Sequence, residues 1–284
     1  MRKIIVKLMG GLGNQMFQFA AAKNVAKLLN EDYEIIFDTS FLEDRTIDIV
    51  YRDYDLSIFN LSNQLDNSLN QKFNKIIIND MNIITAINNI HLLKNDKRDL
   101  YFEGFFQIHY LVDKSMNQYY KFNEFSNKET EKFFLENVTD KSLMINIRRA
   151  DYVSRPSALS FHGFLGEEYV KKALSKFKND EYDKIFIFSD EPDWCEKNLH
   201  IDNSSVVGHE HAGNKFRDYL HLMSKFKNFI IPNSTFAWWA AWISDNQNNS
   251  TKIISPGKKL WFRNNPEIAQ LIIPNNWDKL DSLE

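Results

Sequence analysis

The stretch LMINIRRADYV, residues 143–153, is the most informative part of the chain. An apolar run with β-branched residues ends there in two adjacent arginines, Arg148 and Arg149, which are followed by Asp151. Arginines that directly follow a strand can bind an anion, such as phosphate, at the edge of a parallel sheet. The alternative is a strand that ends in solvated surface charges, and the flanking segments have to distinguish the two.

Apolar strands alternate with helical segments on both sides of this stretch. We expect strands at 4–8, 33–38, 143–148, 184–189, 229–232 and, as the last strand, 252–255. Helices are expected at 16–29, 166–178, 214–225 and 235–243, with a short helix opened by Asp190-Glu191-Pro192-Asp193. Between 39 and 140 the signal is weaker, with short apolar runs at 75–78 and 100–106. Repeated β-then-α order predicts an α/β protein with parallel sheets covered by helices, in two halves hinged near residues 120–140.

Composition excludes several classes of protein. The 284 residues, 43% of them hydrophobic, are enough for two α/β domains of ordinary size. A net charge of −3 provides no general attraction to nucleic acid or to an anionic membrane, so a phosphate site has to be local. The single cysteine, Cys195, excludes an internal disulfide framework and a Cys-rich zinc site, and fits a reducing cytoplasm. We expect neither a signal peptide nor an integral membrane span, because no apolar run approaches roughly 20 residues.

A glycine turn follows the first expected strand. Gly11-Leu12-Gly13 begins like a dinucleotide-binding fingerprint, but Met16 occupies the place of the third glycine. No Gly-Lys-Ser/Thr follows, so the segment is not a Walker loop either. A glycine turn that lets the backbone approach a ligand remains, with Asn14 and Gln15 at a helix N-terminus. The alternative is an ordinary tight turn between strand and helix.

Two further strand ends carry polar groups. Asn233-Ser234-Thr235-Phe236 precedes an expected helix, where hydroxyls can cap the helix and free N–H groups can bind an anion. Trp238, Trp239 and Trp242 behind this turn are expected to pack in the core. Ser189-Asp190 ends another strand at what should be the same sheet edge. Its carboxylate could accept hydrogen bonds from a base or ribose, or could cap a helix.

The chain offers no convincing metal site. Asp53-Tyr54-Asp55 has the Asp-x-Asp spacing of a metal–nucleotide motif, but no apolar strand precedes it. His209 and His211 are close in sequence but lack further ligands. We therefore expect no metal.

Taken together, these segments resemble the α-1,2-fucosyltransferases, glycosyltransferase family 11, and especially the bacterial members. The matches run in order along most of the chain: 10–18 (GGLGNQMFQ), 51–56 (YRDYDL), 104–107 (GFFQ), 147–153 (IRRADYV), 162–163 (HG), 188–190 (FSD) with 194–195 (WC), 222–224 (LMS) and 233–239 (NSTFAWW). No single match is decisive, but their common order is specific.

The resemblance implies a GT-B-like fold, in which two Rossmann-type halves with parallel sheets face a cleft. Residues 1–135 would form the acceptor-side domain, and residues 136–284 would bind the GDP-sugar. It also implies inverting, metal-independent transfer of L-fucose from GDP-β-L-fucose to the 2-hydroxyl of a galactoside, in α-1,2 linkage and without a cofactor. The acceptor would be a galactose-containing oligosaccharide or glycolipid of a bacterial surface glycan such as O-antigen. The protein would work in the cytoplasm or peripherally at the inner membrane.

Three other functions stay open from the residues. One is transfer of a different nucleotide-sugar on the same scaffold, and another is sugar binding without catalysis. A dinucleotide-dependent oxidoreductase is disfavoured by Met16. The sequence also departs from the family pattern His-x-Arg-Arg-Gly-Asp, because Asn146 replaces the histidine and Ala150 the glycine. Asparagine donates and accepts hydrogen bonds but cannot become a cation near neutral pH.

The expected site residues follow from strand alternation and from the resemblance. Since side chains alternate along a strand, Asn146 and Arg148 should share one face while Arg149 points to the other. Arg148 is expected to clamp the diphosphate, and Arg149 to hold the loop by pairing with an acid. The proton acceptor is expected to be Asp151 or His162, both in the loop after the arginines. The full sets are Arg148, Asp151 and His162 for catalysis, and Gly11, Gly13, Asn14, Asn146, Arg148, Asp190, Ser234, Thr235 and Phe236 for the donor.

Overall fold

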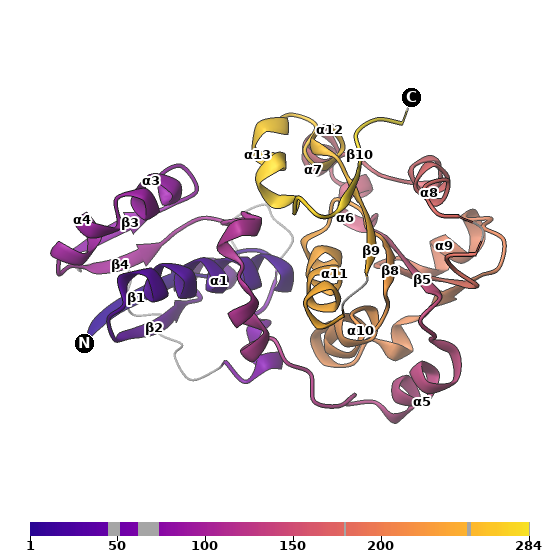
Figure 1. The fold of residues 1–284 in the computed structure, drawn as a ribbon, viewed down its shortest axis with the longest axis horizontal. Helices are drawn as coiled ribbons and strands as arrows, with labels where there is room; N and C mark the ends of the chain where they lie inside the picture. The colour runs from indigo at the N-terminus through magenta and orange to yellow at the C-terminus, as the bar shows by residue number, and fades with distance from the viewer. Residues whose placement is uncertain (45–51, 62–73, 179, 249–250, 284) are drawn as a thin grey trace. The chain divides into compact units, whose positions relative to one another are not determined.

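The computed structural model describes residues 1–44, 52–61, 74–178, 180–248 and 251–283 (Figure 1). Tyr51 of the YRDYDL match lies outside the described residues. The chain divides into two compact units, Met1–Tyr119 and Tyr120–Glu284. This division falls earlier than the expected boundary between residues 135 and 136, because residues 120–137 pack onto the second unit. Within that segment, Tyr120 contacts Trp239 edge-on with ring centroids 5.0 Å apart.

The first unit is built on a four-stranded parallel sheet in the order β2-β1-β4-β3. Its strands are β1 (Arg2–Lys7), β2 (Tyr33–Asp38), β3 (Lys75–Ile78) and β4 (Asp99–Phe102). Its helices are α1 (Leu12–Leu29), α2 (Ser40–Glu43), α3 (Ile83–Asn88) and α4 (Ile90–Asn95), with 3₁₀ turns η1 (Leu56–Phe59), η3 (His109–Leu111) and η4 (Lys114–Gln118). Helix α1 begins four residues before the predicted start, because extended Gly11 caps it directly after the glycine turn. The predicted βαβ opening is confirmed.

The second unit contains a six-stranded parallel sheet in the order β10-β9-β8-β5-β6-β7. The strands are β5 (Ser142–Ile147), β6 (Lys184–Ser189), β7 (Ser204–Val207), β8 (Asn228–Ile230), β9 (Lys252–Pro256) and β10 (Asp278–Leu280). From β5 the chain first adds strands on one side and then, from β8 onward, on the other. The strand order therefore reverses between β5 and β8, and such a switch point is where open α/β sheets bind their ligands.

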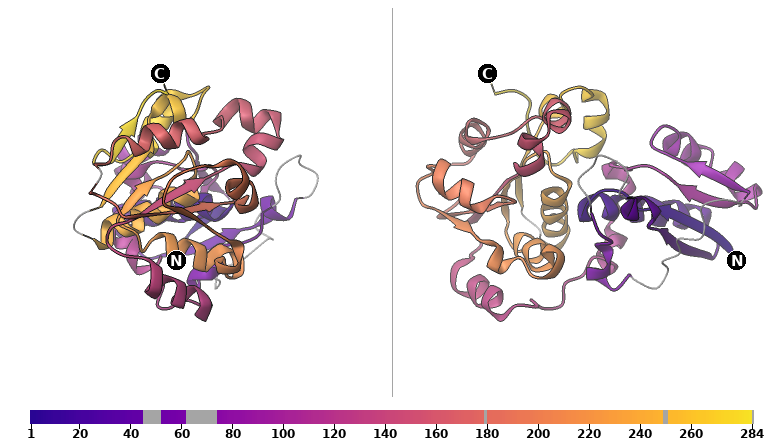
Figure 2. Two further views of the ribbon diagram at one scale, coloured as in Figure 1. Left: turned by 90° about the vertical axis from the view of Figure 1, so that its right-hand side faces the viewer. Right: turned by 180° about the vertical axis from the view of Figure 1, so that it is seen from behind.

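Helices cover both faces of this sheet (Figures 1 and 2). They are α5 (Lys128–Asn137), α6 (Ala150–Ser154), α7 (Pro156–His162), α8 (Glu167–Leu174), α9 (Pro192–Asn198), α10 (Arg217–Met223), α11 (Thr235–Gln247), α12 (Lys258–Trp261) and α13 (Pro266–Ile272), with 3₁₀ turns η5 (His209–His211) and η6 (Asn214–Phe216). Leu143, Ile145 and Ile147 of β5 share a core cluster with α8 and α9. All six residues of β5 are buried, as a central parallel strand requires.

The tryptophans of α11 lie in the core, as predicted. Trp238 and Trp239 are completely buried, and Trp242 is almost so. The indole N–H of Trp238 donates to the carbonyl oxygen of Ile272 in α13 at 2.8 Å, so even its polar atom is satisfied inside the unit. These rings stabilise the helix behind the Asn233–Phe236 turn and are not exposed for a sugar to stack on.

The sequence prediction misses strands β7 and β10 and misplaces the start of one helix in the second unit. The strand at 252–255 is not the last one, because β10 pairs in parallel with β9 through the register Asp278↔Ile254 to Leu280↔Pro256. The helix predicted from residue 214 begins at Arg217, because Lys215 and Phe216 before it have left-handed backbone angles. No helix in the described part of the chain is long and apolar enough to cross a bilayer.

Candidate functional site

The switch point of the second sheet brings two of the predicted segments together. Strands β5 and β8 are hydrogen-bonded neighbours in the register Leu143↔Asn228 to Ile145↔Ile230. The residues that follow them, Arg148 after β5 and Ser234 after β8, therefore leave the same edge of the sheet. This edge is the carboxyl end of the parallel strands, where side chains and helix N-termini converge on a ligand.

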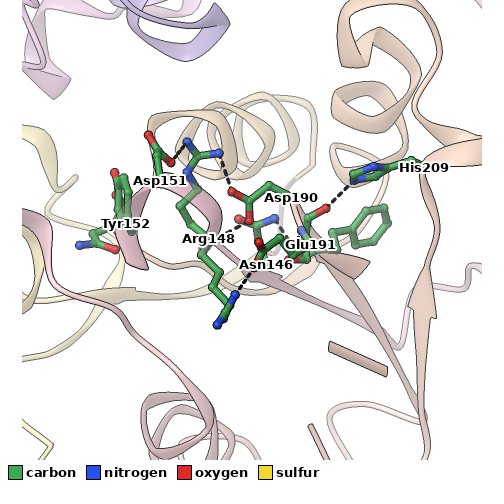
Figure 3. A network of polar contacts seen from close by, with 11 residues as sticks. Asn146, Arg148, Asp151, Tyr152, Asp190, Glu191 and His209 are labelled. Atoms are coloured by element: carbon green, nitrogen blue, oxygen red, sulfur yellow. Dashed lines mark hydrogen bonds and ion pairs between the residues drawn. The ribbon is translucent and has the colours of Figure 1, made fainter. Parts of the chain in front are cut away.

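Arg148 lies between two carboxylates (Figure 3). Its Nη1 is 2.8 Å from Oδ2 of Asp190, and its Nη2 donates to Oδ1 of Asp151. The guanidinium also lies 5.3 Å from the centre of the Tyr152 ring. About a fifth of each of the three charged side chains is exposed, 22% for Arg148, 20% for Asp151 and 18% for Asp190. A ligand anion can therefore reach the cation, but it has to compete with the two acids for it.

Arg149 faces the other side of the sheet, as strand alternation predicts. Its Nη1 donates to Oε2 of Glu191, and its guanidinium lies 4.5 Å from the ring centre of Trp194 in α9. The backbone N–H of Arg149 donates to Oδ1 of Asp190 at 2.9 Å. Arg149 thus holds the loop by pairing with an acid, as expected, and its main chain fixes the carboxylate that contacts Arg148.

Asn146 occupies the position where the resemblance expects a histidine. The side chain is 7% exposed, and its Nδ2 donates to the carbonyl oxygen of Phe188 at 3.1 Å. The amide therefore ties the end of β5 to the end of β6, just before Ser189 and Asp190. This contact needs a donor but no positive charge, so a neutral amide can make it.

The N-terminus of α11 provides the second electropositive element at the switch point. Ser234 is its N-cap residue, with an extended backbone, and its side chain makes no capping hydrogen bond to the described residues. The first turn, which starts with Thr235 and Phe236, contains no acidic residue among those the structure describes. A 13-residue helix therefore presents its positive dipole end without a neutralising carboxylate of its own. The hydroxyl of Tyr152 donates to the Asn233 carbonyl at 3.0 Å and connects this turn to the arginine loop.

His162 reaches the same region from the end of α7. Its ring stacks on Tyr152 with centroids 4.3 Å apart and planes 8° apart, and its carbonyl accepts from Nδ2 of Asn233 at 2.7 Å. Burial lowers the pKa of His162 to about 4; Asp151 opposes this shift and Arg148 adds to it. The imidazole is therefore neutral near pH 7, able to accept a proton but only as a weak base.

Transfer activity is expected to show no inflection near pH 6.5 that belongs to His162. With a pKa of about 4, this imidazole changes charge well below the neutral range. The check is a pH–rate profile of kcat between pH 5 and 8 for the wild type and for His162→Gln. An inflection near pH 6.5 that disappears in His162→Gln would contradict the buried, neutral state of this residue.

The glycine turn of the first unit is organised by two buried glutamines. Gln15 donates to the carbonyl oxygens of Gly10 at 2.9 Å and Asp53 at 2.8 Å, and its Oε1 accepts from the N–H of Asp55. Gln18 bridges Met9 and Gly104 in the same way. Gly10, at φ +71°, has the left-handed conformation that favours glycine. The shape of the turn therefore depends on Gln15, which the sequence pattern assigned only to the helix N-terminus, and on Gln18, to which it assigned no role.

The expected donor residues of this turn lie at the start of α1. Gly11 is the N-cap, Gly13 is in the first helical turn, and Oδ1 of Asn14 accepts from Nε2 of Gln107 at 2.9 Å. In the Asp53–Asp55 segment, the backbone of both aspartates bonds to Gln15. No group of three His, Cys, Asp or Glu within the described ranges is arranged to hold a metal ion.

Three residues of the site have contacts that the sequence does not signal. Nε2 of His209 lies 2.9 Å from the carbonyl oxygen of Ser189, at the end of β6 (Figure 3). Tyr152 and Asn233 join the two loops by the contacts given above. His209 was noted only for its closeness to His211, because a contact over 20 residues depends on the pairing of β6 with β7.

The fold and the site define a class of protein: a two-unit α/β protein with an arginine and a helix N-terminus at the switch point of its second sheet, where an anion can be expected to bind. Comparison with known proteins identifies it further. A model of glycosyl transferase family 11 matches residues 2–277, and the chain belongs to this family.

Two curated relatives from Escherichia coli are similar over nearly their whole length. The O-antigen biosynthesis glycosyltransferase WbnK is 29% identical over 91% of this chain and 94% of its own. An α-1,2-colitosyltransferase is 27% identical over 98% of this chain and 99% of its own. The crystal structure of POFUT1 in complex with GDP-fucose has a TM-score of 0.50 at 13% identity, and the match covers 89% of this chain and 97% of that one. The predicted GT-B-like α/β fold is confirmed, and the chain is a glycosyltransferase of family 11.

Proposed function

We propose that this glycosyltransferase transfers L-fucose from GDP-β-L-fucose to the 2-hydroxyl of a galactoside, with inversion and without a metal ion. The second unit would hold the donor, and the first unit would carry the acceptor. A galactose-containing oligosaccharide or glycolipid of a surface glycan is the proposed acceptor. The O-antigen biosynthesis name of one relative supports this class of acceptor.

The observation that carries the proposal is that Arg148 and the N-terminus of α11 follow neighbouring strands at one sheet edge and are linked through Tyr152. When a sugar leaves GDP, negative charge develops on the β-phosphate and has to be compensated. A guanidinium can do this through paired, charge-assisted hydrogen bonds, and the Ser234–Phe236 turn would add a hydroxyl and backbone N–H groups. Both groups leave the same sheet edge, so one diphosphate can be reached by both. With these charges in place, the reaction would need no metal.

Donor binding would also change the surroundings of Asp151. Because Asp151 pairs with Arg148, the diphosphate would have to take over at least part of that guanidinium. Asp151 would then lose its cation beside the reacting sugar. We therefore favour Asp151 over His162 as the group that receives the acceptor's proton. A dissociative transition state would let this proton move late, so a weak base is sufficient.

Transfer of colitose is the second candidate, and it is favoured by one observation. A relative that matches 98% of the chain is named as an α-1,2-colitosyltransferase. Colitose is fucose without its 3-hydroxyl, so the two donors share the diphosphate and the base. Residues that contact the sugar would decide between them, whereas Arg148 and the α11 N-terminus would serve both.

A two-stage experiment tests the proposed function. GDP is expected to raise the melting temperature with increasing concentration, because a ligand that binds only the native state stabilises it. NAD is expected to have no such effect. Incubation with GDP-fucose and lactose should then yield a trisaccharide whose new linkage is α-1,2 by NMR, at an unchanged rate in EDTA. Stabilisation by GDP without fucose transfer, together with transfer from GDP-colitose, would favour the second candidate. The absence of any GDP effect would contradict both.

A further inference from the structure

The loop before α10 has an unusual backbone. Lys215 and Phe216 are adjacent non-glycine residues with left-handed φ angles of 51° and 59°, and Gly213 just before them has φ +66°. The loop is closed where the Ala212 carbonyl accepts from the N–H groups of Asp218 and Tyr219 at 3.0 and 3.1 Å. Left-handed residues with bulky side chains are costly, and they persist where the surroundings hold them, often at ligand sites. These backbone angles set the direction of the Phe216 side chain.

Phe216 is held edge-on against two other rings but is not buried. Its ring lies 5.2 Å from His209 and 5.9 Å from Tyr219, at interplanar angles of 87° and 74°. The side chain remains 41% exposed. A phenylalanine that only closed the loop would be expected to bury its ring, because burial is what stabilises an aromatic side chain. Here the strained backbone keeps an aromatic surface in solvent.

This aromatic shelf, made of His209, Phe216 and Tyr219, lies at the carboxyl ends of β6 and β7. His209 reaches the Ser189 carbonyl at 2.9 Å, and the Tyr219 hydroxyl donates to the Val207 carbonyl at 2.5 Å. Ser189 directly precedes Asp190, the carboxylate that contacts Arg148 (Figure 3). The shelf contacts the end of β6 through His209, and Arg148 contacts the same strand end through Asp190.

We infer that Phe216, supported by His209, is the platform on which the purine base of the donor nucleotide stacks. The inference rests on the proposed function for the identity of the donor. A nucleoside diphosphate needs an electropositive place for its phosphates and a flat apolar surface for its base. Arg148 and the α11 N-terminus provide the first, and the exposed ring of Phe216 provides the second. Asp190, which lies between them, can accept hydrogen bonds from ring N–H or amino groups of the base or from the ribose. Stacking recognises the flat ring, so this contact should select for the base and not for the sugar.

The test separates binding of the base from binding of the phosphates. Asparagine adopts left-handed angles readily, so Phe216→Asn removes the ring while keeping the loop conformation. By calorimetry, Phe216→Asn is expected to bind GDP about tenfold or more weakly, the effect of losing one base–aromatic stack. Its affinity for inorganic pyrophosphate should equal that of the wild type. Phe216→Tyr should retain GDP binding within about twofold, because it keeps the stacking face. Tyr110→Ala removes an aromatic of similar exposure, 47%, from the first unit and should leave GDP binding unchanged.

Each outcome has a defined meaning. Wild-type GDP affinity in Phe216→Asn would overturn the platform while leaving the proposed function intact. Equal losses for GDP and pyrophosphate would also overturn it, because they would indicate a collapsed loop and not a missing base contact. A wild-type protein that binds pyrophosphate as tightly as GDP would also overturn the platform, because no base contact would then contribute to binding. A wild-type protein that binds neither ligand would contradict the proposed function. A selective loss for GDP in Phe216→Asn, with Phe216→Tyr unaffected, would support the platform.

Discussion

Replacing Arg148 by alanine is expected to lower kcat/KM for sugar transfer by roughly 10²–10³, the scale of removing one preorganised charge stabiliser. The guanidinium is the cation that contacts both Asp151 and Asp190 at the end of β5. Without it, the leaving diphosphate would meet two carboxylates and only the dipole of α11. Most of the loss should appear in kcat, because charge on the β-phosphate is greatest in the transition state. Steady-state kinetics with GDP-fucose and lactose measure it.

Two companion variants isolate the role of Arg148. Arg149→Ala removes the neighbouring arginine, which faces Glu191 and Trp194, and should lower kcat/KM less than tenfold. Asp151→Asn removes the acid that competes for the guanidinium and should bind GDP several-fold more tightly, since one negative charge near the phosphates is lost. Near wild-type turnover in a folded Arg148→Ala variant would refute the diphosphate clamp. Equal losses in Arg148→Ala and Arg149→Ala would point to disruption of the loop.

The centre of the second unit was predictable because its signals are local. β5 and β6 are continuous apolar runs, and their predicted spans agree with the structure to within a residue. Strand alternation was sufficient to separate Arg148 from Arg149, because the period of two continues past the end of β5 into the loop. Asp190 and Ser234 follow strands of the same sheet, and parallel pairing brings such strand ends to one edge.

The parts that were not predicted depend on contacts between distant residues. β10 is only three residues long and mostly exposed, and it exists because β9 provides a partner. The aromatic shelf requires left-handed angles at Lys215 and Phe216, which no propensity of lysine or phenylalanine predicts. Residues 154–165, for which the sequence predicts no helix, contain the whole of α7, whose final residue His162 stacks on Tyr152.

Asn146 illustrates how a departure from the family pattern can be compatible with the site. The family pattern has a histidine, whose imidazole can titrate, where this chain has Asn146. In the structure the side chain supports the backbone of Phe188 and is nearly buried, and Arg148 provides the positive charge two residues later. The contact with the Phe188 carbonyl requires a hydrogen-bond donor, and asparagine provides one without the cost of burying a charge.

The second large effect is expected in stability at acidic pH, from His221 in α10. Its ring is 3% exposed and is stacked between Phe122 and Phe125, with centroids 4.7 and 4.1 Å away. Neither ring nitrogen has a hydrogen-bond partner among the described residues. Burial, with Lys225 and Arg217 nearby, lowers the pKa of His221 to about 3, although Asp218 opposes the shift. The stack holds the first residues of the second unit against α10.

Because the folded-state pKa of His221 lies below the unfolded value of about 6.5, the unfolded chain binds the proton more readily. The contribution of neutral His221 to stability is therefore complete above about pH 6.5 and is lost as the pH falls toward 3. By linkage the loss is about 3 kcal/mol at pH 4. His221→Phe keeps an aromatic ring in the stack and cannot take up a proton. It should be at least as stable as the wild type at pH 7, because two unpaired buried nitrogens are removed.

Urea unfolding of the whole protein at pH 4, 5, 6 and 7 measures this effect. In the wild type the unfolding free energy should fall steadily below pH 6.5, and in His221→Phe most of that slope should disappear. The part that remains is expected from His162, whose pKa is also lowered by burial. His200→Phe, at an exposed position, serves as the control and should keep the wild-type slope. If His221→Phe retained the full acid sensitivity, the protonation that weakens the fold would have to occur elsewhere. The stack of Phe122, His221 and Phe125 would then be only a packing contact.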